Sequence, residues 1–295
     1  MDNELTLFDR INVIRDVIKK YGEDKFYISF SGGKDSTVLH YLIDEALPGN
    51  NIPRVYADTG IEYNDVKAYV KELQATDDRI EIIKPSVNIK QMLEKDGYPF
   101  KSKEHSNIVR VFQNSGMGLT VNRYLSGDCR NPCPQVLRYQ FSDKNTLKIS
   151  DKCCRRMKKE PFNTWMKANS KTITITGMMA SEGGQRARIQ ACIITDKSGR
   201  LKKFHPLLKV SEEWEEWYIQ ERGIKLCKLY YPPYNFDRTG CKGCPYALGL
   251  QEQLEVMFTL MPEEYQQCEI IWEPVYQEYR RLNYRLKSTI QTRLL

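Results

Sequence analysis

Six consecutive residues, Ser31-Gly32-Gly33-Lys34-Asp35-Ser36, have the composition of a loop that binds phosphate. The apolar run Phe26 to Phe30 precedes them and predicts a buried strand. Apolar residues then recur at helical spacing up to Leu47, so we expect Ser36-Thr37 to begin a helix. Such a turn presents backbone N–H groups at the positive end of the helix dipole, and Lys34 adds charge. A plain turn with a serine cap is the alternative.

A second group of residues with chemical potential is formed by cysteines. Cys153 and Cys154 are adjacent, and Cys241-Lys242-Gly243-Cys244 is a C-x-x-C segment. Four thiolates in two close pairs suit an iron–sulfur cluster or a structural zinc ion. Zinc sites usually take both pairs as C-x-x-C, so the adjacent pair fits tetrahedral zinc less well. Buried free thiols are the third interpretation.

The other cysteines give weaker signals. Cys129 and Cys133 have C-x3-C spacing, so they are either redox or sulfur-carrying thiols or unligated loop cysteines. Cys192 and Cys227 lie in apolar surroundings and are predicted core residues. Cys268 lies in a predicted helix, where structural packing is favoured over nucleophilic chemistry.

Bulk composition favours a cytoplasmic enzyme. The chain has 295 residues, nine cysteines and no apolar stretch long enough for a membrane helix, and it starts with polar residues unlike a signal peptide. In such a chain, metal or catalytic roles for cysteine are favoured over disulfides. The formal charge of +7 is compatible with anionic nucleotides or nucleic acid but does not prove either.

The periodicity predicts strands that alternate with helices, hence an α/β fold with a doubly wound, mainly parallel sheet. Predicted strands are Phe26–Phe30, Ile52–Ala57, Ile80–Ile83 and Thr172–Thr176, with a hairpin from Gln190–Thr195 to Leu201–Phe204. Predicted helices are Leu7–Ile18, Asn64–Leu73, Asn88–Leu93, Ile108–Phe112 and one from the Ser211 cap to Glu221. Residues 114–152 are expected to be a polar, turn-rich connection, which at this length is either functional or contains an element that the pattern does not reveal. A boundary near Val210 separates an adenine nucleotide-binding domain (1–210) from a helical, cysteine-containing region (211–295), whose second helical part is Leu250–Arg293.

The glycine-rich loop resembles the pyrophosphate loop of the adenine nucleotide α-hydrolases, which include ATP pyrophosphatases and phosphoadenosine phosphosulfate (PAPS) reductases. Arg54 to Glu62 is similar to the second strand and Asp-Thr-Gly turn of that superfamily. Thr176 to Glu182, with Arg186 and Arg188 after it, resembles its Gly-x-Arg-x-x-Glu segment. Trp214 to Pro245 resembles the end of the reductase-like members. The resemblance implies a Rossmann-like nucleotide hydrolase fold.

Cys153 to Phe162 resembles the double-cysteine segment of the iron–sulfur adenosine phosphosulfate (APS) reductases. That resemblance implies a [4Fe–4S] cluster held by Cys153, Cys154, Cys241 and Cys244, with zinc as the alternative. It also implies that Lys158 is a basic neighbour of cluster and substrate.

The chain departs from the reductases at three places. It lacks their C-terminal Glu-Cys-Gly-x-His motif, which carries the nucleophilic thiol. It keeps the Gly-Gly-Lys-Asp-Ser form of the ATP-cleaving members, and Met179 stands where the Gly-x-Arg segment has arginine, which weakens the case for a sulfate pocket. We therefore expect an enzyme that cleaves ATP at the α-phosphate.

The resemblance assigns expected roles to the site residues. The amides of Gly32, Gly33 and Ser36 hold the β- and γ-phosphates, assisted by the hydroxyls of Ser31 and Ser36. Lys34, Asp35 and Asp58 are the catalytic set: Lys34 offsets charge on pyrophosphate, and the two carboxylates are candidate Mg²⁺ ligands. The remaining expected nucleotide-binding residues are Thr59, Gly60, Gly177, Arg186 and Arg188.

Relatives that thiolate tRNA or serve DNA phosphorothioation combine an ATP-cleaving loop with cysteine-bound clusters, so sulfur transfer to a nucleic acid or small acceptor is the leading hypothesis. Expected partners are an adenine nucleotide, a sulfur donor protein and a nucleic acid, with no membrane, and a homodimer stays open. Arg280, Arg281, Arg285, Lys287 and Arg293 form either a nucleic-acid contact or the solvated face of a terminal helix. The alternatives are APS or PAPS reduction, through Cys129, Cys133 or a partner's thiol, and a non-catalytic nucleotide- or nucleic-acid-binding subunit.

Overall fold

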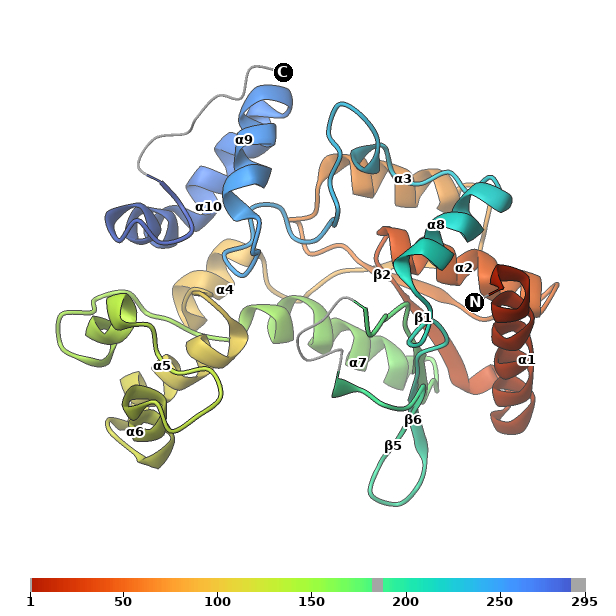
Figure 1. Cartoon of the computed structure of the whole chain (residues 1–295), viewed down its shortest axis with the longest axis horizontal. Helices are drawn as coiled ribbons and strands as arrows, with labels where there is room; N and C mark the ends of the chain where they lie inside the picture. The colour runs from red at the N-terminus through yellow and green to blue at the C-terminus, as the bar shows by residue number, and fades with distance from the viewer. Residues whose placement is uncertain (1, 182–187, 288–295) are drawn as a thin grey trace. The chain divides into compact units, whose positions relative to one another are not determined.

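The computed structural model of the chain describes residues 2–181 and 188–287 (Figure 1). The chain divides into two compact units, each built from separate stretches. Unit 1 comprises Met1–Asp58, Asn64–Lys84 and Pro161–Thr239, and unit 2 comprises Thr59–Tyr63, Pro85–Glu160 and Gly240–Leu295. Residues 211–239, which the sequence analysis groups with the C-terminal region, belong to unit 1 because helix α8 (Glu212–Glu221) packs against helix α2 (Lys34–Ala46).

Unit 1 contains one six-stranded sheet in the order β3-β2-β1-β4-β6-β5. Its strands are β1 (Phe26–Phe30), β2 (Arg54–Ala57), β3 (Ile80–Ile83), β4 (Ile173–Ile175), β5 (Ile193–Thr195) and β6 (Leu201–Phe204). All neighbours pair in parallel except β5, which pairs antiparallel with β6 at the edge. The structure thus confirms the predicted α/β fold with a mainly parallel sheet.

Helices cover both faces of this sheet because successive strand residues point to opposite sides. Phe26 and Ile28 of β1 belong to a core cluster with α1 (Asn3–Tyr21), α2 and α8. Tyr27, between them, packs with Trp165 of α7 (Glu160–Ala168) on the other face. Helix α3 (Asn64–Gln74) and the short helices η1 (Glu23–Lys25) and η5 (Lys228–Tyr230) complete the unit.

Unit 2 is mainly helical. Its helices are α4 (Ile89–Asp96), α5 (Lys103–Ser115), α6 (Leu119–Ser126), η2 (Gln135–Phe141), the π-helix η3 (Arg155–Lys159), α9 (Leu250–Leu260) and α10 (Pro262–Arg281). The stretch 114–152, predicted to be a turn-rich connection or to contain an unrecognised element, does contain two short helices, one side of which is buried through Val121, Tyr124 and Leu137. None of the helices in the described part of the chain is long and apolar enough to cross a membrane.

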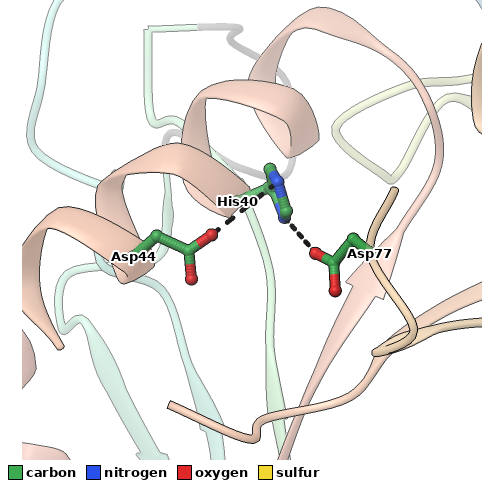
Figure 2. Close-up of side chains that lie close together, drawn as sticks. All are labelled: His40, Asp44 and Asp77. Carbon is green, nitrogen blue, oxygen red and sulfur yellow. Dashed lines mark ion pairs between the residues drawn. The ribbon is translucent and has the colours of Figure 1, made fainter. Parts of the chain in front are cut away.

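A buried network of charges fixes α2 against β2 in unit 1. Figure 2 shows that His40 and Asp44 of α2 and Asp77 come close together, with His40 3.8 Å from Asp44 and 4.0 Å from Asp77. Among the described residues, these are the three potential metal ligands whose ligand atoms all lie within 4.8 Å of one another.

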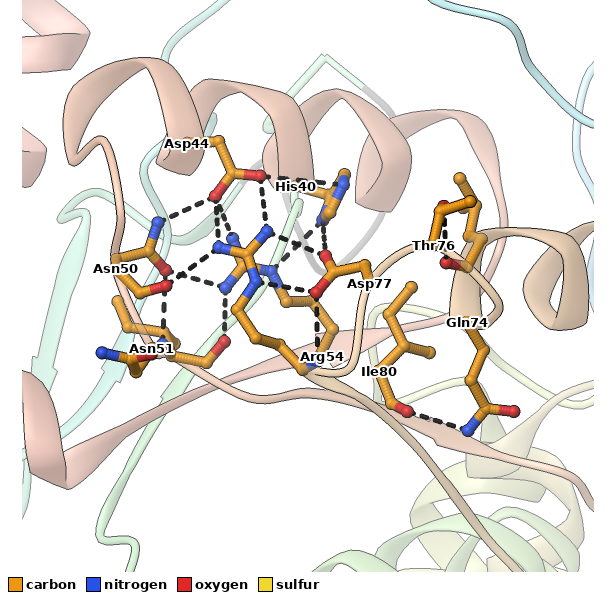
Figure 3. Close-up of polar contacts among 12 residues, drawn as sticks. His40, Asp44, Asn50, Asn51, Arg54, Gln74, Thr76, Asp77 and Ile80 are labelled. Carbon is orange, nitrogen blue, oxygen red and sulfur yellow. Dashed lines mark hydrogen bonds and ion pairs between the residues drawn. The ribbon is translucent and has the colours of Figure 1, made fainter.

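Two arginines account for this cluster without a metal ion (Figure 3). Arg54 Nη2 lies 2.6 Å from Asp44 Oδ1, and Arg54 Nε donates to His40 Nδ1 at 3.2 Å. Arg79 reaches both carboxylates at 2.8 Å. Burial and the charge of Arg54 lower the pKa of His40 to about 4, so the imidazole is neutral. We interpret the cluster as a structural ion network, because its carboxylates are already neutralised.

Loss of Arg54 should destabilise unit 1. Its side chain is 0% exposed, so Arg54→Met removes one of the two arginines that pair with the partly buried Asp44 and leaves buried acceptors of Asn50 and Ile52 without this donor. We expect the free energy of unfolding to fall by about 3 kcal/mol, measured by urea denaturation. Arg200→Met removes a pair in which the arginine side chain is 74% exposed, and should cost less than about 1 kcal/mol. Equal effects of the two substitutions would show that the network does not stabilise the unit.

Acid should also destabilise the protein through its histidines. Burial lowers the pKa of His40, His105 and His205 to about 4, whereas an unfolded histidine titrates near pH about 6.5. Their contribution is therefore fully present above pH about 6.5 and is lost as the pH falls toward about 4. At pH 5, His205→Asn should reduce the protons taken up on unfolding by about one, as read from the pH dependence of the free energy of unfolding. An unchanged slope would contradict this.

Candidate functional site

The first candidate site lies at the carboxyl edge of the sheet in unit 1. Strands β2 and β3 lie on one side of β1 and β4 lies on the other, so the order in which strands are added to the sheet reverses between the parallel strands β1 and β4. Ligands of open α/β sheets bind at such a switch point. The glycine-rich loop follows β1, and Gly177 follows β4. A Cβ atom on Gly177 would lie 2.7 Å from the carbonyl carbon of Asp35, so the two segments are in contact and only glycine fits.

Hydrogen bonds shape the loop from within. The Ser31 and Ser36 hydroxyls lie 2.9 Å apart, and Ser36 Oγ donates to the Gly33 carbonyl at 2.9 Å. Gly32 has φ +70°, and its Cβ would lie 2.8 Å from Val70. These contacts place Ser31 to Gly33 directly before α2, whose first turn contains Lys34, Asp35 and Ser36 and has backbone N–H groups without a partner within the helix.

Three residues that the sequence analysis missed contact this loop. The Lys34 N–H donates to the Tyr230 hydroxyl at 2.9 Å, which lies 2.8 Å from Thr239 Oγ1. Lys34 Nζ lies 3.2 Å from Glu215 Oε2. Burial and the charge of Asp35 raise the pKa of Glu215 to about 7. Although burial alone would lower it, the charge of Glu215 raises the pKa of Lys34, which therefore carries full positive charge.

The turn after β2 is partly engaged in contacts of its own. Asp58 lies 3.5 Å from Lys67 Nζ. Thr59, only 3% exposed, donates from its N–H and its hydroxyl to Glu62 at 2.9 and 2.7 Å. Gly60 has φ +84°, which favours glycine. This turn is therefore preformed, and Asp58 has a cation beside it.

The region after Gly177 gives a mixed result. Arg188 is exposed, and Arg186 lies outside the described residues. Met179, which stands where the similar family segment carries arginine, is buried in the core of unit 1 and supplies no charge there. The anion-binding roles of Arg186 and Arg188 stay predictions.

The second candidate site, in unit 2, contains the four predicted cysteine ligands. Cys153 and Cys154 form the start of a helical segment that passes directly into the π-helix η3. Single π-helical turns occur frequently at functional sites. Burial raises the pKa of Cys153, and the charges of Cys241, Cys154 and Cys244 raise it further. Burial likewise raises the pKa of Cys241 and of Cys244, and the charge of Cys154 adds to the increase in both, so these thiols lie close enough to influence one another.

Helix α10 holds the C-x-x-C turn in place. Tyr276 donates to the Gly243 carbonyl, and Trp272 Nε1 donates to the Lys242 carbonyl at 3.1 Å. Gly243 has φ +60°, and its Cβ would lie 2.8 Å from Cys268 Sγ. The turn also pairs with the segment after β2, because the Lys242 N–H donates to the Ile61 carbonyl at 2.7 Å. The two cysteines are therefore positioned by a packed scaffold.

Four thiols are a donor set that either a [4Fe–4S] cluster or a tetrahedral zinc ion accepts. Cys153, Cys154, Cys241 and Cys244 thus suit both occupants that the sequence predicts, and the cluster stays a prediction. Cys241 and Glu62 raise the pKa of Lys158, a cation that would favour ionised thiols.

The remaining cysteines divide by exposure. Cys129 is exposed, whereas Cys133, Cys227 and Cys268 are buried, and Cys192 is partly buried. Burial raises the pKa of Cys133 to about 11 and of Cys268 to about 12. The structural role predicted for Cys268 is confirmed, since it packs against the C-x-x-C turn.

The C-terminal arginines contact unit 2 itself. Arg280 pairs with Glu269 at 2.5 Å, and Arg281 pairs with Glu278 at 2.7 Å. Arg285 donates to the Pro245 carbonyl at 2.7 Å, directly after the C-x-x-C turn. These three side chains therefore have structural partners, and Arg293 lies outside the described residues.

Comparison with known sequences decides the family. The sequence profile of the phosphoadenosine phosphosulfate reductase domain matches residues 25–127 and 130–247. The chain belongs to the PAPS reductase family. The matched ranges contain the glycine-rich loop, Asp58, Glu215 and all four clustered cysteines, whereas Cys129 falls in the gap between them.

Individual relatives of this PAPS reductase family member are distant. An uncharacterized protein of Methanocaldococcus jannaschii is 24% identical over 246 residues, which are 80% of this chain and 46% of that protein. The chain thus spans about half the length of this curated relative. The PAPS reductase of Candida auris is 15% identical with a TM-score of 0.42, covering 74% of this chain and 88% of its own. The U34-tRNA thiolase NcsA of Methanococcus maripaludis, solved with its [4Fe–4S] cluster, is 17% identical with a TM-score of 0.41, covering 95% and 80%.

The cysteine site predicts a defined metal content. Protein purified without oxygen should contain about four iron and four sulfide ions per chain. Cys153→Ser should lose most of the iron, because it removes a predicted ligand. Gly243→Ala should do the same without touching a ligand, since its Cβ would collide with Cys268 and Tyr276.

Cys129→Ser provides the matched control, because this exposed cysteine lies outside the clustered set and should leave the iron content unchanged. Iron and sulfide assays together with the visible spectrum provide the measurement. Stoichiometric zinc without iron in the unsubstituted protein would contradict the cluster assignment.

Proposed function

We propose that this PAPS reductase family protein cleaves ATP between its α- and β-phosphates and couples the reaction to sulfur transfer. An acceptor oxygen attacks the α-phosphorus, the bond to the bridging oxygen breaks, and pyrophosphate leaves with the electron pair. The observation that best supports this proposal is the position of Lys34. This residue begins α2 at the switch point of the sheet, and its ammonium group carries full positive charge.

The loop has the components that this reaction requires. Negative charge gathers on phosphoryl oxygens in the transition state, so donors and cations must be fixed in advance. The first-turn amides of α2 supply donors, and Lys34 offsets the charge of the leaving pyrophosphate. Asp35 and Asp58 are the residues that would hold Mg²⁺, which would supply positive charge to stabilise the phosphoryl oxygens. The Ser31 and Ser36 hydroxyls, which are hydrogen-bonded to each other, would assist in holding the β- and γ-phosphates.

The cysteine site supports a sulfur-transfer role. Cys153, Cys154, Cys241 and Cys244 would hold the [4Fe–4S] cluster, which would supply redox or sulfur-binding chemistry when present. Lys158 would balance the charge of its thiolates. The acceptor is proposed to be a nucleic acid or a small molecule, the sulfur to come from a donor protein, and the compartment to be the reducing cytoplasm. The same proposal includes that two copies of this protein form a homodimer.

One observation keeps sulfonucleotide reduction as the second candidate. Reduction of APS or PAPS needs a thiol that attacks the sulfate sulfur, and an accessible thiolate is required for that step. The buried Cys268 and Cys133 are poor nucleophiles because burial raises the pKa of each thiol. Cys129 is exposed, so it suits the role better than Cys133, and a partner's thiol is the other possibility.

Product analysis separates the candidates. Anaerobically purified protein is incubated with Mg-ATP, and separately with APS and PAPS plus a thiol reductant. We expect AMP or an adenylated product together with pyrophosphate, reduced at least about hundredfold in Lys34→Ala because transition-state charge is no longer balanced.

Lys67→Ala is the matched control, since it removes a lysine of the same unit that pairs with Asp58 rather than lying in the loop. Its loss of activity should be smaller than that of Lys34→Ala. Sulfite from APS or PAPS that disappears in Cys129→Ser, with ATP untouched, would overturn the proposal in favour of reduction. Tight nucleotide binding without turnover of any substrate would favour the non-catalytic binding subunit.

A further inference from the structure

The lysine of the glycine-rich loop has a buried counter-ion. Lys34 Nζ lies 3.2 Å from Oε2 of Glu215, whose side chain is 1% exposed, whereas the Lys34 side chain is 23% exposed. The second oxygen of Glu215, Oε1, is buried and has no hydrogen-bond partner among the residues that the structure describes. The Lys34 ammonium therefore separates the Glu215 carboxylate from solvent and is the main group that stabilises its charged form.

The surroundings of Glu215 make this pairing costly to break. Its neighbours on α8, Trp214 and Tyr218, are buried, and their rings stack with centroids 5.2 Å apart. The facing charged groups are Lys34 and Asp35 on α2, and Glu212 on its own helix. Two of these three are acidic, and they oppose ionisation of Glu215.

Groups farther along α8 are paired elsewhere. Glu45 of α2 contacts Tyr218 and Arg222, at 2.8 Å each. Helix α1 contacts α8 through the Asn3 carbonyl, which accepts from Trp214 Nε1 at 3.1 Å. Lys34 is therefore the cation that faces the Glu215 carboxylate.

We propose that Glu215 is a positioning residue of the loop: it holds the Lys34 ammonium while no anion is bound and competes with a polyphosphate for it. This inference rests on the proposed function, because it takes the loop to be a phosphate site. Binding of the anion draws the Lys34 ammonium toward phosphate and away from Glu215. A buried carboxylate that loses its counter-ion takes up a proton from solvent, since the charged form is no longer compensated. Polyphosphate binding is thereby coupled to proton uptake.

The coupling has a definite sign. Burial and Asp35 raise the pKa of Glu215 to about 7 while Lys34 is still beside it, so the carboxyl group is mostly ionised at pH 8. Departure of Lys34 removes an interaction that lowers this pKa, so the pKa rises further and the group is protonated in the complex. At pH 6 the group is already mostly protonated, and the additional proton uptake disappears.

Calorimetric titration with inorganic pyrophosphate, without Mg²⁺, tests the proposal. Titrations at pH 8 in two buffers with different ionisation enthalpies give the number of protons taken up. We expect Glu215→Gln to bind pyrophosphate about tenfold more tightly. In this variant, binding does not have to break the ion pair between Lys34 and Glu215, which we expect to lower the affinity of the unsubstituted protein by a factor of about ten. We also expect it to take up nearly one proton fewer than the unsubstituted protein. Glu216→Gln, which removes the neighbouring exposed carboxylate of α8, should change the affinity less than about twofold and leave proton uptake unchanged.

The outcomes separate this inference from the function on which it rests. Lys34-dependent binding with equal affinity and equal proton uptake in Glu215→Gln would overturn the inference and leave the phosphate site intact. Pyrophosphate binding that is absent, or unchanged in Lys34→Ala, would overturn the phosphate site itself. Should Glu215→Gln fail to fold, the unsubstituted protein suffices. Equal proton uptake at pH 8 and pH 6, after subtraction of the protonation change of pyrophosphate itself, would contradict the proposal.

Discussion

The placement of α2 depends on one buried guanidinium. Arg54 begins β2 and reaches Asp44 in the last part of α2, so it ties the helix to the neighbouring strand. The opposite end of the same helix is the first turn that follows the glycine-rich loop. Since an anion site at a helix N-terminus works only when the helix axis points at the ligand, the network far from the loop determines where the loop amides point. A structural ion network and a chemical site thus share one rigid element.

The local sequence predicts the loop well, together with the strand before it and the helix after it, because these elements follow one another within about twenty residues. The contacts that control the loop lysine come from residues distant in the chain. Glu215 and Tyr230 lie about 180 and 196 positions away from Lys34. A glutamate between two buried aromatic residues of one helix is a signal that sequence analysis can use, yet it does not identify the cation that the glutamate meets.

In unit 2 as well, the sequence predicts the chemistry of the site but not the contacts that position it. Adjacent cysteines and a C-x-x-C segment are visible in the sequence, and so is their candidate chemistry. What holds them is not visible: tyrosine and tryptophan side chains of α10 donate to the carbonyls of the turn. The same holds for the basic C-terminal residues, whose spacing resembles a nucleic-acid contact although Arg280, Arg281 and Arg285 contact acidic and carbonyl groups of their own unit. Charge patterns in a sequence cannot show whether the counter-charge is internal.

The interleaving of the two units has a consequence for how such a protein can change over time. The chain passes between the units five times, and one passage falls between Asp58 and Thr59, directly after a strand of the sheet. Most domains are separated by exposed linkers and can be exchanged as continuous pieces. Neither unit of this chain is encoded by one continuous stretch, so no single exchange of a continuous piece can replace unit 2 while keeping unit 1. The two sites are inherited together, and new specificity has to arise by substitution within them.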